Sequence, residues 1–127
     1  VLDILYQNAL AFVHASASEG LPMVVLEAAA AGVVPIISDI LEHREVIDRI
    51  GGFCFRTGDI YDCARTIEVV FRSAASLPRI GKDIQRAVLQ HYDWGHAANL
   101  TAARYRTIGS VERVRERRRA VQLRFAV

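Results

Sequence analysis

The stretch EGLPMVVLEAAAAG, residues 19–32, decides the fold that this sequence predicts. It follows the apolar segment AFVH (residues 11–14) across a short loop, and it leads into an apolar helix expected from Pro22 to Ala31. Gly32 is expected to end this helix, since glycine readily adopts the conformation that follows a helix C-terminus. A strand, a tight loop and a helix in this order predict free backbone N–H groups and a positive dipole end at one point, which is typical of a phosphate site.

The rest of the chain continues the alternation of strands and helices. The apolar run Val33–Ile37 predicts a strand buried on both faces of a parallel sheet. Because Pro35 cannot donate a ladder hydrogen bond, this strand is expected to begin late or to lie partly at an edge. The other expected elements are strands at Ala9–His14 and Phe53–Phe55 and helices at Leu2–Asn8, Glu42–Ile50, Ile60–Ser73, Pro78–Tyr92 and Trp94–Ile108.

This order predicts an α/β domain with a parallel sheet and C-terminal helices. Three strands are fewer than the usual five or six of a doubly wound domain, so the chain is expected to be the second half of one. Asp59 and Asp93 are expected to cap the helices that follow them. Trp94 is expected to pack as an apolar anchor.

Length and composition indicate one globular domain. A chain of 127 residues allows a modest core, and 52% hydrophobic with 24% charged residues is the balance of a folded soluble protein. No apolar run approaches the roughly 20 residues that span a bilayer. The first residues lack Met and carry Asp3 in an apolar stretch, so they are expected to be the interior of a longer chain. Cys54, in an expected buried strand, and Cys63 are expected to be free thiols in a reducing compartment, and no zinc-like spacing is present.

The net charge of +2 conceals an asymmetry between body and tail. Residues 1–110 carry ten Lys and Arg against twelve Asp and Glu, whereas residues 111–127 carry six Arg against two Glu. The acidic body argues against nucleic-acid binding. The Arg-rich tail, residues 109–127, has two open interpretations: a solvated helix, or a basic patch that contacts anionic lipid headgroups at a membrane surface.

Several segments in register resemble the C-terminal, nucleotide-sugar-binding part of retaining GT-B glycosyltransferases (family 4-like, group 1). The resemblance covers residues 1–108 and implies a Rossmann-like parallel sheet, the second half of a GT-B C-terminal domain. The chain departs from the family pattern where Ala15 and Val34 replace prolines. The matching segments are VHASASEGLPMVVLEAAAAG (residues 13–32), PIISDI (35–40), HREVI (43–47), GGFCFRTGD (51–59) and YDW (92–94).

The resemblance implies donor-binding roles for six residues. Glu27 would accept hydrogen bonds from the two ribose hydroxyls of the nucleotide. Glu19, the candidate catalytic residue, would bind hydroxyls of the transferred sugar and support a positively charged transition state. The remaining donor contacts would come from the backbone of Gly20, Leu21 and Met23 and from the hydroxyl of Ser16.

Each of these residues also has an ordinary structural interpretation. Glu27 could face solvent, Ser18 or Glu19 could cap the helix, and Ser16 could be a turn residue. His14, at a strand end, is expected to be structural. Asp39 and Glu45 follow the next strand and are expected near the same sheet edge, either as ligand contacts or as loop and cap acids.

The function implied by the resemblance is transfer of a hexose from a nucleotide diphosphate sugar to a saccharide or lipid-linked acceptor, with retention. The enzyme would be cytoplasmic, with peripheral contact at the inner face of the membrane as one option, and would use neither metal nor cofactor. The family's diphosphate-neutralising basic residues and its acceptor-binding N-terminal domain lie upstream of this segment, so the isolated chain is expected to be inactive. Two alternatives remain open: a truncated domain that acts as a binding or interaction module, and a non-transferase of the same fold, such as a nucleotide-sugar epimerase.

Overall fold

The computed structural model describes residues 2–108 of the chain, so the predicted Arg-rich tail lies outside the described residues. A parallel three-stranded sheet and flanking helices confirm the predicted α/β class. Each predicted strand and helix begins and ends within two residues of its expected bounds, whereas the 3-10 turn η1 was not predicted. The elements are α1 (Leu2–Gln7), β1 (Ala11–His14), α2 (Met23–Ala30), β2 (Val34–Ser38), α3 (Leu41–Ile50), β3 (Phe53–Phe55), α4 (Ile60–Arg72), the 3-10 turn η1 (Ala74–Ser76), α5 (Leu77–His91) and α6 (Trp94–Ile108).

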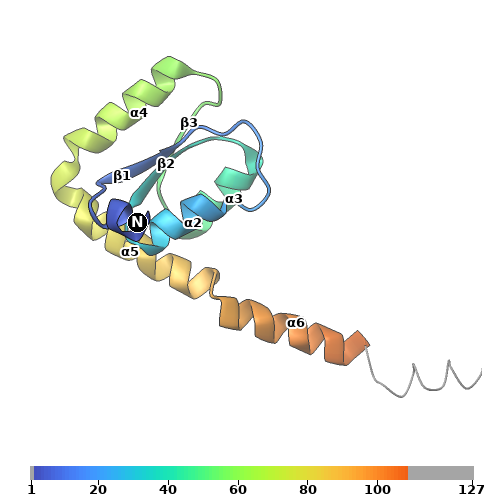
Figure 1. The fold of residues 1–127 in the computed structure, drawn as a ribbon. Coiled ribbons are helices and arrows are strands. Elements are labelled where there is room, and N and C mark those ends of the chain that lie inside the picture. Colours follow the sequence, from blue (N-terminus) through green and yellow to red (C-terminus); the bar gives the residue numbers. More distant parts are fainter. Residues whose placement is uncertain (1, 109–127) are drawn as a thin grey trace, which may run out of the picture. The chain divides into compact units, whose positions relative to one another are not determined.

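The sheet forms the centre of the first of two compact units, Val1–His91. The strand order is β1-β2-β3, and all five residues of the central strand β2 are buried. Helices α2 and α3 each pack against α5 on one side of the sheet, and α4 contacts β2 and β3 from the other side (Figure 1). The core is therefore built around β2.

The second unit begins at Tyr92 and contains α6. Asp93 caps this helix as predicted, because its Oδ2 accepts a hydrogen bond from the His96 N–H at 2.8 Å. Trp94 is 75% exposed, so the predicted apolar anchor is wrong. None of the described side chains of α6, residues 94–107, is buried. None of the helices within residues 2–108 is both long and apolar enough to cross a lipid bilayer.

The proline in β2 is accommodated by the limits of strand pairing. The strand begins at Val34, one residue later than predicted and one residue before Pro35. Strand β1 pairs with β2 from Val34 onward, whereas β3 pairs with it only from Ile36. At Pro35, β2 therefore has a neighbouring strand on one side only, which confirms the expectation that this part of the strand lies at an edge.

The expected buried position of Cys54 is also wrong. Both cysteines are free, and Cys54 is exposed while Cys63 is partly buried. Strand β3 lies at an edge of the sheet, and Cys54 lines a shallow cavity of about 340 Å³ together with Asp39 and Arg44. Desolvation in this partly enclosed place raises the pKa of the Cys54 thiol.

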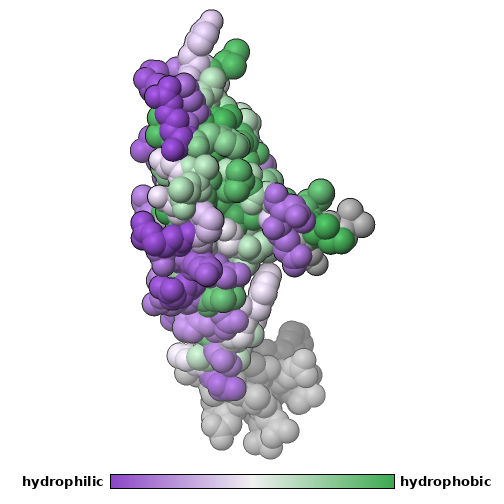
Figure 2. Space-filling model, turned by 90° about the vertical axis from the view of Figure 1, so that its left-hand side faces the viewer, coloured by the Kyte–Doolittle hydropathy of each residue, from purple (hydrophilic) through white to green (hydrophobic). Residues whose placement is uncertain are grey.

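Hydrophobic side chains remain open to solvent on β1 and α4. Val13 of β1 is exposed, although parallel sheets are usually covered on both faces. Figure 2 shows hydrophobic residues (green) gathered beside hydrophilic ones (purple), seen from the left of Figure 1. The exposed large hydrophobic residues of α4 are Ile60, Tyr61, Val69 and Phe71.

Helices α2 and α5 approach each other at two glycines. Gly32 follows α2 with a φ of +82°, as predicted for the residue that ends this helix. A Cβ on Gly81 of α5 would lie only 2.0 Å from the carbonyl oxygen of Gly32. Gln85, one turn further along α5, donates a hydrogen bond of 2.7 Å to the carbonyl of Ala30, which satisfies one free carbonyl at the end of α2.

Asp39 joins the end of β2 to the loop after β3. Its Oδ1 accepts hydrogen bonds of 2.9 Å from both the N–H and the hydroxyl of Thr57, and its Oδ2 accepts one from Arg44. These donors, the Thr57 N–H first, lower the pKa of Asp39 to about 2. The structure thus supports the interpretation of Asp39 as a loop acid, whereas Glu45 lies exposed on α3.

We expect Gly81→Ala to destabilise the protein. The added methyl group would clash with the backbone of Gly32, and such overpacking costs about 1–3 kcal/mol even though alanine favours helix formation. Urea unfolding followed by circular dichroism measures the change. Gly20→Ala is the matched control, because a Cβ there would meet nothing within 4 Å. Equal stability of Gly81→Ala and wild type would contradict the close helix contact.

We expect Asp39→Asn to be less stable than wild type at pH 7. The pKa of Asp39 is lower in the folded than in the unfolded chain, so its contribution is present above about pH 4 and is lost toward pH 2. The difference between variant and wild type should therefore shrink over this interval in urea unfolding curves. Glu45→Gln removes a charge from an exposed position and serves as control. A difference that stays constant down to pH 2 would argue against this role.

Candidate functional site

Polar residues from four segments meet at one edge of the sheet. His14 ends β1, Ser38 ends β2, and His43 lies in the first turn of α3. Glu19 lies in the loop between β1 and α2. Because parallel strands place their carboxyl ends at the same edge, and ligands of open α/β sheets bind there, this edge is the candidate site.

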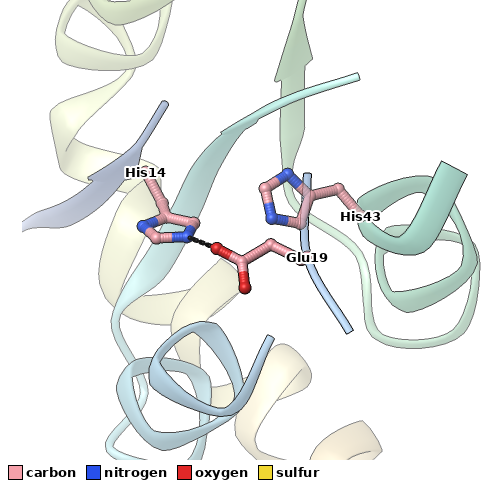
Figure 3. Close-up of side chains that lie close together, drawn as sticks. All are labelled: His14, Glu19 and His43. Carbon is pink, nitrogen blue, oxygen red and sulfur yellow. Dashed lines mark hydrogen bonds and ion pairs between the residues drawn. The ribbon is translucent and has the colours of Figure 1, made fainter. Parts of the chain in front are cut away.

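The carboxylate of Glu19 is held by the histidine at the end of β1. Its Oε1 lies 2.9 Å from Nε2 of His14, and the two side chains are 28% and 23% exposed. Hydrogen bonding to His14, followed by that to Ser16, lowers the pKa of Glu19. Glu19 is therefore an anion near neutral pH, and its second oxygen points away from His14 (Figure 3).

The loop that carries Glu19 is fastened to β2. The Ser16 hydroxyl donates to the carbonyl of Ser18 at 3.0 Å, and the Ser16 carbonyl accepts a hydrogen bond from the Ser38 hydroxyl. Ser16 is thus a turn residue that also contacts Glu19. Neither Ser18 nor Glu19 caps α2, since that helix has no side-chain cap hydrogen bond.

The entrance to α2 differs from the expected row of free amides. Pro22 occupies the N-cap position rather than the first helical one. The Met23 N–H donates to the carbonyl of Leu21 at 2.8 Å, so this amide is engaged inside the turn. Gly20, Leu21 and Met23 are all exposed, and a Cβ on Gly20 would meet nothing within 4 Å. The turn is accordingly open to solvent at the position where the sequence predicts the donor.

Glu27 lies on α2, four residues beyond its first residue, which corresponds to about 6 Å along the helix axis. Its side chain is exposed while its helical neighbours Leu26 and Ala28 are buried. Among the residues that the structure describes, the side chain of Glu27 has no hydrogen-bond or ion-pair partner. It is accessible to a ligand, and it takes no part in the contact between Glu19 and His14.

His43 is a site residue that the sequence did not single out. It is completely buried, and its ring centroid lies 5.3 Å from that of His14. Its Nδ1 lies 2.8 Å from the carbonyl oxygen of Ser38, and its Nε2 has no hydrogen-bond partner within the described part of the chain. Figure 3 shows the ring of His43 turned toward Glu19. No sequence signal identifies this group, because His14, Glu19 and His43 do not form a spaced motif and are brought together by the sheet.

Comparison with known proteins gives a family match. Residues 1–86 match the family described as "Glycosyl transferases group 1". The search among curated proteins found no match.

One similar solved structure is sucrose-phosphate synthase from Thermosynechococcus elongatus, with 23% sequence identity and a TM-score of 0.77. The similarity covers 83% of this chain and 27% of that one, so the chain spans about a quarter of that protein's length. These findings confirm the predicted resemblance and the Rossmann-like fold. Since the family match covers more than half of the sequence, the chain belongs to the glycosyl transferases group 1 family.

Proposed function

We propose that the chain is the donor-binding part of a retaining GT-B glycosyltransferase. The whole enzyme would transfer a hexose from a nucleotide diphosphate sugar to a saccharide or lipid-linked acceptor. The observation that carries this proposal is the ionised Glu19, held by His14 at the carboxyl edge of the sheet in a chain of this family. Such a carboxylate, with one oxygen pointing away from its partner, can accept hydrogen bonds from sugar hydroxyls (Figure 3).

The donor would lie across the start of α2. The positive end of the helix dipole favours the diphosphate near Leu21 and Met23, although the Met23 amide would first have to leave its turn to bind a phosphate oxygen directly. Glu27, about 6 Å further along the helix axis, would take the ribose hydroxyls. Glu19, before the helix, would take the hexose. The two acids would thus hold opposite ends of one extended ligand.

Glu19 would also contribute to the chemical step. As the bond to the diphosphate breaks, positive charge develops on the hexose ring, and a nearby fixed carboxylate stabilises it. In front-face transfer the leaving phosphate takes the proton of the acceptor hydroxyl, so the reaction does not require a side chain of this chain as a base. The transfer step itself then needs no metal ion.

The remaining parts of the reaction belong to sequence outside this chain. These are the basic residues that neutralise the diphosphate and the domain that binds the acceptor. The proposed setting is the cytoplasm, in polysaccharide biosynthesis, with the Arg-rich tail as a candidate contact with an anionic membrane.

We expect Glu19→Gln and Glu27→Gln to separate the two ends of the donor. Glu19→Gln should weaken binding of the nucleotide sugar by about 10- to 100-fold while leaving the free nucleoside diphosphate unaffected, because only the sugar contact is lost. Glu27→Gln should weaken both ligands by a similar factor. Isothermal titration calorimetry with a panel of uridine, guanosine and adenosine diphosphate hexoses, each beside its nucleoside diphosphate, measures the effect.

Glu68→Gln is the control for this experiment, since Glu68 is an exposed acid of α4 that pairs with Arg72. Its affinities should equal those of the wild type. If no member of the panel binds, or if neither acid affects binding, the donor site is wrong.

The isolated chain should bind a donor without turning it over. We expect no hexose transfer above background in assays with radiolabelled nucleotide sugars and a mixture of saccharide and lipid acceptors, because the acceptor domain and the basic residues are absent. Efficient transfer by the 127 residues alone would show that this assignment of parts is incorrect.

A further inference from the structure

Three metal-ligating side chains converge beside the proposed donor site. His14, Glu19 and His43 each offer one ligand atom, and these atoms lie within 4.8 Å of one another. The residues come from the end of β1, the loop before α2 and the first turn of α3. Figure 3 shows the three side chains directed toward a common point.

The hydrogen bonds of His43 determine which of its nitrogens is available. The Ser38 hydroxyl donates its proton to the Ser16 carbonyl, so toward Nδ1 of His43 its oxygen can only accept. The Ser38 carbonyl, 2.8 Å from Nδ1, is likewise an acceptor. Nδ1 must therefore carry the hydrogen, and in the neutral ring the lone pair is on Nε2.

That lone pair has no hydrogen-bond donor facing it in the part of the chain that the structure describes. His43 is completely buried, and its Nε2 has no partner within residues 2–108, although buried polar atoms are nearly always hydrogen-bonded. A histidine whose Nδ1–H donates to a backbone carbonyl while Nε2 is bare is the usual arrangement of a metal ligand. Nε2 of His43 points toward His14 and Glu19, so a metal ion bound between the three side chains would satisfy it.

The other two members provide charge and access. Glu19 supplies a carboxylate that is ionised near neutral pH, and both Glu19 and His14 are partly exposed, so an ion can enter from their side. A tetrahedral Zn²⁺ site with bonds of about 2.0–2.2 Å needs ligand atoms roughly 3.3–3.6 Å apart. The 2.9 Å between Oε1 of Glu19 and Nε2 of His14 must widen slightly, and Nε2 of His14 must give up the hydrogen that it shares with the carboxylate. The longer separations, which reach up to 4.8 Å, must contract, and the partly exposed His14 and Glu19 can move more readily than the buried His43.

We propose that His14, Glu19 and His43 bind a divalent transition-metal ion of the Zn²⁺ type. Two imidazole nitrogens and one carboxylate oxygen suit zinc, whereas magnesium and calcium require sets of oxygen ligands. Three protein ligands leave a fourth position open to water. The spacing of these residues in the sequence gives no sign of such a site. The proposed site differs from the expectation in the sequence analysis that the protein binds no metal.

Occupation of this site would compete with the sugar donor. The ion takes the Glu19 carboxylate that the proposed function assigns to hexose hydroxyls, so bound zinc should weaken donor binding. This consequence rests on the proposed function, whereas metal binding by the chain alone does not. The ion would act as an inhibitor and not as a participant in transfer.

Metal binding is tested on the full chain after treatment with a chelator. Titration with Zn²⁺ followed by calorimetry should show one site per chain, and Co²⁺ should give the visible absorption of a tetrahedral complex with nitrogen ligands. We expect His14→Ala, Glu19→Gln and His43→Leu each to weaken Zn²⁺ binding by at least about 10-fold. Because His43→Leu changes the core, circular dichroism checks that this variant still folds. If His43→Leu unfolds, the Zn²⁺ affinity of His14→Ala, a change at a partly exposed position, tests the site instead.

Two controls distinguish this site from adventitious binding. His91→Ala removes the histidine at the end of α5, and Cys54→Ser removes the exposed thiol. Both should bind Zn²⁺ like the wild type. Absence of a stoichiometric site, or loss of binding with Cys54→Ser and not with His14→Ala, would overturn the proposal.

A final titration separates the metal site from the donor site. Nucleotide-sugar affinity is measured with and without saturating Zn²⁺. Weaker donor binding in the presence of Zn²⁺ is expected and supports competition. If Zn²⁺ binds but no nucleotide sugar does, the proposed function fails and the metal site stands. If the nucleotide sugar binds but Zn²⁺ does not, the metal site is wrong and the proposed function stands.

Discussion

Parallel hydrogen bonding between β1 and β2 is the interaction on which the candidate site depends. It runs from Ala11 opposite Val34 to His14 opposite Ile37, and it aligns the carboxyl ends of both strands. The complete burial of β2 anchors this pairing in the core. Residues that are more than twenty positions apart in the chain, such as His14 and His43, thereby lie beside each other.

Two carboxylates at this edge have lowered pKa values for different reasons, and the difference indicates their roles. Asp39 is saturated by donors from its own chain, namely Thr57 and Arg44, and so serves to hold two loops together. Glu19 receives its main hydrogen bond from one histidine and keeps an oxygen turned away from it. An acid that is held in place without being saturated retains the capacity to bind something else.

Local sequence patterns predicted nearly all of the secondary structure. Apolar periodicity, Gly32 and the capping acids Asp59 and Asp93 determine element boundaries through contacts a few residues apart, which a sequence displays directly. Expectations about burial were less successful. The exposure of Cys54 and Trp94 depends on which elements pack over them, and that is a property of the assembled fold.

The candidate site was predictable to a similar extent. Glu19 and the turn before α2 follow from the family pattern, and the structure places them at the expected sheet edge. The partners of Glu19 did not follow from it. His14 was expected to be structural, and His43 drew no attention, because their meeting requires the parallel register and the Ser38 contacts. The engaged amide of Met23 likewise depends on the exact geometry of one turn.

The hydrogen bonds of Ser38 to Ser16 and His43 have a consequence for the way in which this edge responds to ligands. Its hydroxyl holds the Ser16 carbonyl while its own carbonyl holds the ring of His43. A shift of the Ser16 segment would leave the buried Ser38 hydroxyl without its hydrogen-bond acceptor, which is energetically costly. The Ser16 segment is therefore already ordered before a ligand binds, and binding costs less conformational entropy than it would if this segment were flexible.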